Sequence, residues 1–408
     1  MKRKIFRNTL FLSGSQIVGR LIGFFYFIYL ARSLSVTDFG IYAWVLGFVY
    51  NFYPLADFGI EKIVIRDLPR KPEKANYYLK RLLPLRLYLG LASLLILLIV
   101  GLLMGIGSFK LFLVFLFGLS ILPTNLIHLI AFIENAREKS MTYALSTLGI
   151  ISLTALLGVL IINFNLPLAY LLIAYFISSL TVLGFLFSKM HSLGLNLGWK
   201  QDFLFWKKII KDAWAFALIT TLAVFYLRIS LVLTGYLLGD YWAGIYGASS
   251  KFIEAGVMIP QGITLALFPL FSRLLKGDKK RLKAIYLKTW FLLLMLSLPI
   301  GATMFWGGKF FIPLIYGSEY LPSVPVFSTM GLLIIFLFVN SIAGNIIHNS
   351  KKVKQFLPFS FLNFLVGLGL GLFLIPRIGV MGGVWAMVGG EVFGLIVNNL
   401  FVFKILNE

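Results

Sequence analysis

Residues 243–256 read AGIYGASSKFIEAG and lie between two long apolar runs. The tripeptide Gly244–Tyr246 also occurs at Gly40–Tyr42, 204 residues earlier in a chain of 408 residues. The same stretch carries two charges, Lys251 and Glu254, in a segment whose apolar surroundings disfavour them. The fold must therefore explain both a doubled chain and charge inside an apolar segment.

The composition indicates a membrane protein. Hydrophobic residues make up 60% of the chain and charged residues 13%, against about 25% charged in an average soluble domain. The mean hydropathy is +0.93, and apolar runs of about 20 residues recur, each long enough to cross a hydrocarbon layer of about 30 Å. Barrel strands need only about 10 alternating residues. We therefore expect an all-α polytopic membrane protein whose N-terminal MKRKIFRN leads into the first span rather than into a cleaved signal peptide.

About twelve transmembrane helices are expected. Their approximate ranges are 8–32, 39–60, 84–107, 110–133, 141–163, 166–188, 212–237, 241–270, 285–306, 324–348, 356–375 and 380–402. Prolines inside these spans, at Pro123, Pro260 and Pro299, are predicted to bend their helices, either as moving points or as static kinks.

The basic residues predict an orientation. Alternate loops, counted from the N-terminus, hold 30 of the 37 Lys and Arg residues, the opposite loops hold 4, and 3 lie inside spans. By the positive-inside rule, both termini are expected on the cytoplasmic side of a cell (plasma or inner) membrane. The net charge of +22 then reflects orientation and lipid headgroups, and no nucleic-acid partner is expected.

A second pair of similar segments supports a repeat. Asn125–His128 reads NLIH and Asn345–His348 reads NIIH, each near the end of the fourth span of a six-span half. A chain that crosses the membrane six times returns to the side from which it started. The two halves therefore share one orientation, as in transporters built from parallel repeats. We expect an N-terminal lobe at residues 1–200 (helices 1–6) and a C-terminal lobe at 201–408 (helices 7–12), although short matches also arise by chance.

Motifs for catalysis are not found. The three histidines are not spaced as metal ligands, no HExxH, GxSxG or P-loop pattern occurs, and cysteine is absent. The outer loops offer only isolated acids, which do not form the paired metal site that a glycosyltransferase needs. We therefore expect no enzyme activity, no metal and no cofactor.

The charges inside spans are the candidate site residues, because a charge at mid-bilayer costs about 2.5–3.5 kcal/mol and should face protein or water. Four groups share helix faces and predict a wet cavity between two helix bundles. They are Gln16 with Arg20, Thr221 with Arg228, Tyr246 with Ser250 and Glu254 (Lys251 lies beside them), and Glu391 with Asn398. The cations outnumber the acids, which favours an anionic substrate.

Each of these residues also has a structural interpretation. Lys251 and Glu254 are spaced to pair along one helix, Arg228 can reach the outer headgroups, and Arg20 either pairs with Glu254 or Glu391 or contacts substrate. The Asn and His residues of the two NxIH segments form helix–helix hydrogen bonds or ligand contacts. Two acids at the end of span 2, Asp57 and Glu61, are either solvated helix-end charges or inner-gate partners of Arg66.

Three segments resemble a known family. They are LARSLSVTDFGIYAWVLGFVYNFYPLADFGIEKIVIRDL (30–68), RISLVLTGYLLGDYWAGIYGASSKFIEAGVMIPQGITLALFPLFSRL (228–274) and LIYGSEYLPSVPVF (314–327). They are similar to polysaccharide biosynthesis or oligosaccharide flippases (Wzx-type), members of the multidrug/oligosaccharidyl-lipid/polysaccharide exporter superfamily. The resemblance covers nearly the whole chain but includes no catalytic motif. It implies two six-helix lobes in a V around a central cavity.

The resemblance also implies a function. Such proteins move a polyprenyl-diphosphate-linked oligosaccharide from the inner to the outer leaflet by alternating access, and the resemblance assigns Arg20, Arg228 and Lys251 to a cationic substrate cavity. Membrane lipids, the lipid-linked glycan and glycan-assembly enzymes are the expected partners. A drug/cation antiporter of the same superfamily is the alternative, although spans 1 and 3–6 lack the mid-depth acid that it would use. A membrane enzyme of envelope glycan assembly is the third alternative.

Overall fold

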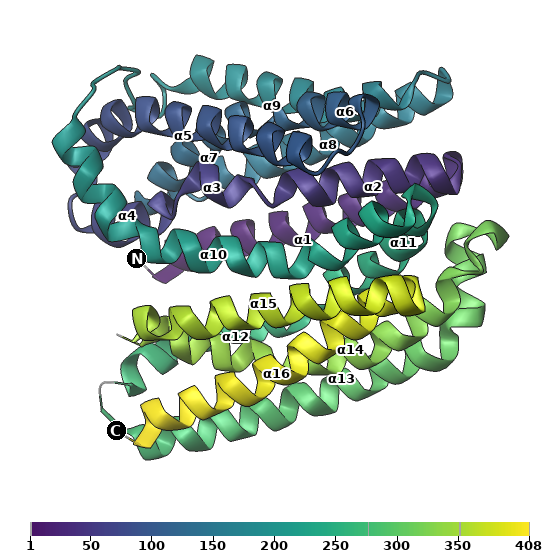
Figure 1. Ribbon diagram of the computed structural model, residues 1–408. Coiled ribbons are helices and arrows are strands. Elements are labelled where there is room, and N and C mark those ends of the chain that lie inside the picture. The colour runs from purple at the N-terminus through teal and green to yellow at the C-terminus, as the bar shows by residue number, and fades with distance from the viewer. Residues whose placement is uncertain (1, 276, 351, 408) are drawn as a thin grey trace. The chain divides into compact units, whose positions relative to one another are not determined.

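The structure is a computed structural model that describes residues 2–275, 277–350 and 352–407, and these residues form helices and no strands (Figure 1). Within these described ranges, twelve helical segments are long and apolar enough to cross a membrane, which confirms the predicted number. The helices are α1 (Lys2–Ser33), α2 (Val36–Tyr50), α3 (Tyr53–Asp57), α4 (Ile60–Asp67), α5 (Ala75–Leu103), α6 (Ser108–Gly118), α7 (Ile121–Ala136), α8 (Met141–Asn163), α9 (Leu168–Lys189), α10 (Phe203–Leu238), α11 (Asp240–Gly256), α12 (Met258–Leu274), α13 (Lys279–Tyr316), α14 (Ser323–Asn349), α15 (Val353–Ile378) and α16 (Val380–Asn407).

Three of the spans consist of two helices each: α2 with α3, α6 with α7, and α11 with α12. In each pair a proline lies in the first turn of the second helix, namely Pro54, Pro123 and Pro260. Proline has no N–H to donate, which the first turn of a helix tolerates and the interior does not. The predicted bends at Pro123 and Pro260 therefore coincide with helix starts, whereas Pro299 lies inside the continuous helix α13.

The chain forms two compact units. Unit 1 comprises the residues up to Tyr29 together with Val45–Val224, and unit 2 comprises Leu30–Trp44 together with Phe225–Glu408. The chain therefore passes from one unit to the other inside α1, α2 and α10. The lobes predicted at residues 1–200 and 201–408 divide the chain by sequence repeat, and this division stays a prediction.

The two GIY copies meet inside unit 2. A Cβ atom on Gly40 of α2 would lie 1.8 Å from the carbonyl oxygen of Asp240, and a Cβ atom on Gly244 of α11 would lie 2.3 Å from that of Val36. Small residues let helix backbones approach this closely in membranes. The repeated glycines are therefore explained by one helix crossing, in which each copy packs against the other.

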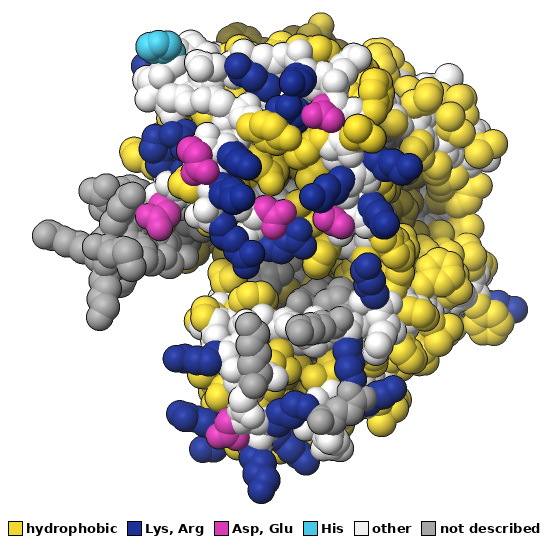
Figure 2. Space-filling model, turned by 90° about the vertical axis from the view of Figure 1, so that its left-hand side faces the viewer, with side chains coloured by type: hydrophobic (Ala, Val, Ile, Leu, Met, Phe, Trp, Pro, Cys, Tyr) yellow, Lys and Arg dark blue, Asp and Glu magenta, His cyan; other side chains and the backbone are white. Residues whose placement is uncertain are grey.

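Charged side chains gather on one face of the molecule. Figure 2 shows many Lys and Arg side chains and few Asp and Glu side chains on this face, with hydrophobic side chains covering the flank. In unit 1, Arg81 and Asp202 are paired, and Arg81 Nε donates to Asp202 Oδ2 at 2.7 Å. A basic face next to an apolar flank agrees with the charge pattern of the loops, and the orientation in the membrane stays a prediction.

Candidate functional site

Three charged side chains from two helices meet in unit 2. Lys251 Nζ donates to Glu254 Oε2 at 2.7 Å along α11, and Arg228 Nη1 on α10 lies 3.4 Å from Glu254 Oε1. The side chains are 25% (Lys251), 28% (Arg228) and 45% (Glu254) exposed. This unit 2 cluster therefore brings two cations to one carboxylate at the surface of the unit.

The predicted pairing of Lys251 with Glu254 along one helix is confirmed, and Arg228 shares the same carboxylate. Arg20 is exposed on α1 and Gln16 is half-buried one turn before it. Both belong to unit 1, so the cluster unites two of the three predicted cations within one unit. The predicted contact of Arg20 with an acid or with substrate stays a prediction.

Two other predicted residues are buried inside unit 2. Tyr246 is 1% exposed and its hydroxyl donates to Met387 Sδ at 3.0 Å. Glu391 is 6% exposed and accepts a hydrogen bond from Asn340 Nδ2 at 2.6 Å. Packing therefore places these two residues inside the unit, whereas the unit 2 cluster lies at its surface.

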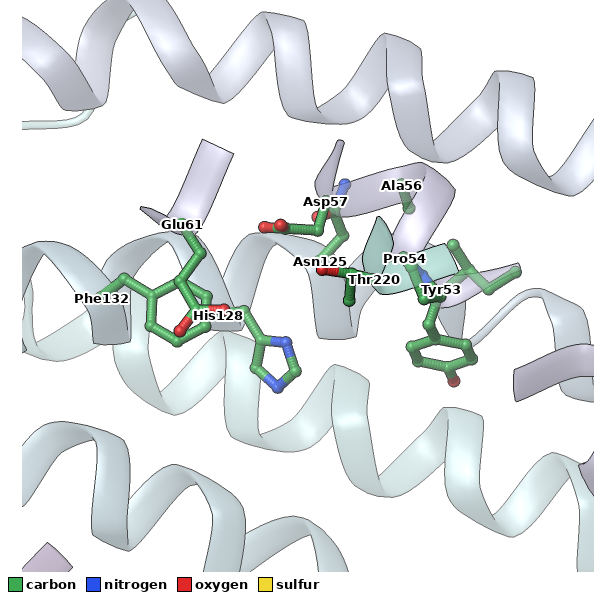
Figure 3. A pocket seen from close by; sticks show the side chains of 10 residues that line it. Tyr53, Pro54, Ala56, Asp57, Glu61, Asn125, His128, Phe132 and Thr220 are labelled. Atoms are coloured by element: carbon green, nitrogen blue, oxygen red, sulfur yellow. The ribbon is translucent and has the colours of Figure 1, made fainter. Parts of the chain in front are cut away.

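Unit 1 contains a small cavity of about 170 Å³. Figure 3 shows Asp57 and Glu61 on the two sides of the α3–α4 break, with Asn125, His128 and Phe132 from one face of α7. The lining residues are Tyr53, Pro54, Ala56, Asp57, Glu61, Ile121, Asn125, His128, Phe132 and Thr220. The break itself consists of Phe58 (φ 50°) and Gly59 (φ 69°), both left-handed, so the two acids project from separate helices.

Two of the lining residues bind a buried cation of α5. Arg86 is 1% exposed, and its Nη2 lies 2.5 Å from Asp57 Oδ1. Its Nη1 donates to Asn125 Oδ1, and Asn125 Nδ2 donates back to the Arg86 carbonyl oxygen at 2.7 Å. A buried charge is tolerated only when it is paired and hydrogen-bonded. In this unit 1 pair of Arg86 and Asp57, the carboxylate neutralises a guanidinium that packing has removed from water.

Sequence reasoning missed this pair. Arg86 lies at the start of the expected span 84–107, but the loop count takes it with the cations of residues 61–86. The apolar run that begins at Leu82, four residues earlier, is the available signal. The alternative that Asp57 and Glu61 are partners of Arg66 is wrong. Arg66 Nε binds Asp67 Oδ1 at 2.7 Å and Nη2 lies 4.0 Å from Asp212 Oδ2.

The asparagines of the NxIH segments form helix–helix hydrogen bonds, as one interpretation predicted. Asn125 bonds α7 to α5, and Asn345 Nδ2 donates to the Thr264 carbonyl oxygen, which bonds α14 to α12. His128 packs against Phe132 with ring centroids 5.5 Å apart. The side chain of His348 lies outside the described residues.

Electrostatics outside the spans follow burial and pairing. Burial raises the pKa of Glu61 above its ordinary value of 4.5, Asp57 raises it further, and Lys62 and Arg86 oppose the increase. The hydrogen bond from Arg81 lowers the pKa of Asp202. Within the described parts of the chain, no three His, Asp or Glu residues are grouped as ligands for a metal ion.

Comparisons with known proteins identify the family. A family model described as polysaccharide biosynthesis protein matches residues 5–275, and a model described as MatE matches residues 215–373. The uncharacterized membrane protein MJ1068 of Methanocaldococcus jannaschii is 23% identical over 219 residues, which cover 51% of this chain and 42% of that protein. The chain thus spans less than half of the length of this relative.

Solved structures share the fold. An inward-facing conformation of a multidrug resistance MATE family transporter of the MOP superfamily has a TM-score of 0.78 at 13% identity, covering 98% of both chains. The lipid II flippase MurJ, in an inward closed conformation, has a TM-score of 0.75 at 14% identity, covering 97% of this chain and 88% of that chain. The MATE multidrug transporter DinF-BH, in complex with a ligand, has a TM-score of 0.72 at 18% identity, covering 100% of this chain and 97% of that chain. This chain therefore has the fold of the MOP-superfamily membrane proteins and, by the match over residues 5–275, belongs to the polysaccharide biosynthesis protein family.

Proposed function

We propose that the protein is a flippase that moves a polyprenyl-diphosphate-linked oligosaccharide from the inner to the outer leaflet of a cell membrane. The match to the polysaccharide biosynthesis family over residues 5–275 carries this proposal. The unit 2 cluster agrees with it, because a diphosphate is an anion and Arg228 and Lys251 outnumber Glu254. Arg20, in unit 1, is the third proposed substrate contact.

The proposed mechanism is alternating access with both termini cytoplasmic. The charged headgroup enters the proposed cationic cavity while the lipid tail stays in the bilayer, and the cations replace the water that the diphosphate loses. The relatives support this cycle, since both inward-facing and outward-facing forms of a MATE family transporter have this fold. Two negative charges that leave a cell with an inside-negative potential of about 100 mV gain about 4.6 kcal/mol, at about 2.3 kcal/mol per charge.

A cation-coupled antiporter is the second candidate, and one arrangement in unit 2 favours it. The buried carboxylate of Glu391 lies beside Asn340, and the side chains of Asn340 and Asn363 both approach Gly394, one turn further along α16. The Oδ1 atoms of both asparagines are buried and have no hydrogen-bond partner among the described atoms. One carboxylate and two amide oxygens suit a hard monovalent cation or a proton, and the MatE match at residues 215–373 covers two of these residues.

Transport by purified protein in proteoliposomes tests the proposal. The assay follows the transbilayer movement of a fluorescent polyprenyl-diphosphate oligosaccharide in wild type, Arg20→Ala and Lys251→Ala. Lys309→Ala is the matched control, because it removes an exposed lysine of α13 that is not among the proposed substrate contacts. We expect wild type and the control to move the lipid and Lys251→Ala to be slower by about tenfold or more, because a lost charge contact is worth at least about 1.4 kcal/mol.

The other outcomes discriminate between the candidates. Movement that is unchanged in both variants would keep the flippase and reject the cationic site. An absence of movement in wild type, together with dissipation of a drug or cation gradient, would favour the antiporter. Transfer of the sugar to an acceptor by the purified protein would favour the glycan-assembly enzyme.

A further inference from the structure

Glu254 occupies the place that an anionic ligand of Arg228 and Lys251 would take. Its two carboxylate oxygens face different cations, Oε1 toward Arg228 at 3.4 Å and Oε2 toward Lys251 at 2.7 Å. A phosphoryl group likewise offers several oxygens to separate cationic donors. The carboxylate therefore has the charge and the position of a substrate phosphate, but it belongs to the protein.

The strength of these contacts permits exchange. The Arg228–Glu254 distance of 3.4 Å is longer than a charge-assisted hydrogen bond, which measures about 2.7–2.9 Å. All three side chains are at least one-quarter exposed, so the cluster is not sealed inside unit 2. A diphosphate with two or more charges can therefore compete with the single carboxylate for these two cations.

We propose that Glu254 is a displaceable counter-ion that occupies the Arg228–Lys251 phosphate subsite until a phosphoryl anion replaces it. This inference rests on the proposed function and adds a specificity residue to it. Glu254 compensates part of the cationic charge in the empty protein, so that anions with one charge compete poorly and diphosphates compete well. It also returns to the cations when the substrate leaves, which speeds release.

The charge arithmetic gives a test with matched variants. Glu254→Gln removes the negative charge that Arg228 and Lys251 share, so we expect inorganic diphosphate to bind about tenfold more tightly to the purified full chain. The double variant Lys251→Met/Glu254→Gln has the wild-type net charge, so its affinity should return to within about threefold of wild type. Glu254→Asp keeps the carboxylate and should also stay near wild type.

A structural role makes the opposite prediction. If Glu254 only joins α10 to α11, Glu254→Gln lowers the melting temperature and leaves diphosphate affinity unchanged or weaker, which would overturn the proposal. The source of the anion is resolved by repeating the measurement with undecaprenyl diphosphate and with phosphatidylglycerol vesicles. Tighter binding of the diphosphate lipid alone supports the proposal, whereas an equal gain for phosphatidylglycerol overturns it in favour of a headgroup site.

The transport assay separates this inference from the flippase itself. Wild-type transport together with unchanged affinity in Glu254→Gln would reject the counter-ion and keep the flippase. If the protein is a flippase and Glu254 is its counter-ion, Glu254→Gln should bind the lipid-linked substrate more tightly. It should also transport this substrate several-fold more slowly, because product release is retarded. Wild-type protein that neither binds nor moves the diphosphate lipid would reject both.

Discussion

The two units hold their charges in different ways. In unit 1, Arg86 is 1% exposed and pairs with one carboxylate, Asp57, so that the charges cancel inside the fold. In unit 2, Arg228 and Lys251 are each about one-quarter exposed and share the carboxylate of Glu254. The same residue types therefore serve packing in one unit and are accessible to an anion in the other.

Burial explains this difference better than sequence position. A buried pair that loses one member leaves an uncompensated charge at about 3–5 kcal/mol, whereas an exposed pair contributes about 0–1 kcal/mol. The unit 1 pair should therefore control stability, and the unit 2 cluster should control binding. Each of the following experiments tests one side of this contrast.

Arg86→Met should have the largest effect. The substitution keeps the side-chain bulk but removes the buried guanidinium and its contacts to Asp57 and Asn125. Because the Asp57 side chain that remains is 25% exposed, we expect a loss of about 1.5–3 kcal/mol. The measurement is the apparent melting temperature and the monodisperse yield of the protein in detergent. Arg228→Met makes the same chemical change at an exposed site and is the control, with an expected loss below about 1 kcal/mol.

The double variant Asp57→Leu/Arg86→Met makes this test stricter. It removes both charges, so it should recover at least half of the stability that Arg86→Met loses, because no buried charge remains unpaired. Arg86→Met with a melting temperature equal to that of Arg228→Met would show that the two units do not differ in this way.

Gly40→Ala and Gly244→Ala should cause the next largest loss of stability. Both glycines lie at the crossing of α2 and α11, where the two GIY copies meet. Each added methyl group would collide with a backbone carbonyl oxygen, at 1.8 Å and 2.3 Å respectively. We expect each variant to lose about 1–3 kcal/mol, as in other overpacked sites. Gly262→Ala, which has no atom within 4 Å of its new methyl group, is the control and should melt at or above the wild-type temperature. Equal melting of all three variants would remove the glycine crossing as a determinant of the fold.

The sequence predicted this crossing only in part. The hydropathy pattern was sufficient to predict twelve spans. In lipid, each span must hydrogen-bond its own backbone groups as a helix, and its sequence is therefore a long apolar run. The two GIY copies indicated a repeat, but not that they pack against each other. Contact between residues 204 positions apart depends on tertiary structure, which local periodicity does not encode.

The candidate site shows a similar limit. The i,i+3 spacing of Lys251 and Glu254 is local and was predicted, whereas the third member, Arg228, comes from another helix. Arg86 was missed because a cation near the expected start of a span looks like a loop residue. Its pairing with Asp57 depends on the break at Phe58–Gly59, where the backbone leaves the helix, and no periodic pattern marks this position.

Arg228→Met should have an intermediate effect, on binding rather than on stability. We expect the affinity for inorganic diphosphate to fall about tenfold, or about 1.4 kcal/mol, while the melting temperature changes little. Arg228→Lys keeps the charge but not the planar guanidinium, so its affinity for diphosphate should lie between those of wild type and Arg228→Met. Calorimetric titration of the purified protein measures this order. A variant that melts as early as Arg86→Met would place Arg228 among the structural charges.

Glu61→Gln should have the smallest effect, and its sign depends on pH. Burial raises the pKa of Glu61, so the folded protein binds this proton more tightly than the unfolded chain does. The carboxylate therefore destabilises the fold as the pH rises above the ordinary value of 4.5, and the effect is complete above the folded-state pKa. Because Glu61 is partly exposed, we expect Glu61→Gln to melt only about 1–2 °C above wild type near pH 8, with the difference vanishing near pH 4.

The control and the opposite result decide what the unit 1 cavity is. Glu73→Gln changes an exposed glutamate of the 3₁₀ turn Pro72–Lys74 and should leave the melting profile unchanged. If Glu61→Gln instead lowers the melting temperature more as the pH rises, the attraction of Lys62 and Arg86 outweighs burial, and the carboxylate is held charged. The unit 1 cavity would then contain an ionised acid beside a paired cation, and its charges would resemble the accessible cluster of unit 2 rather than contrast with it.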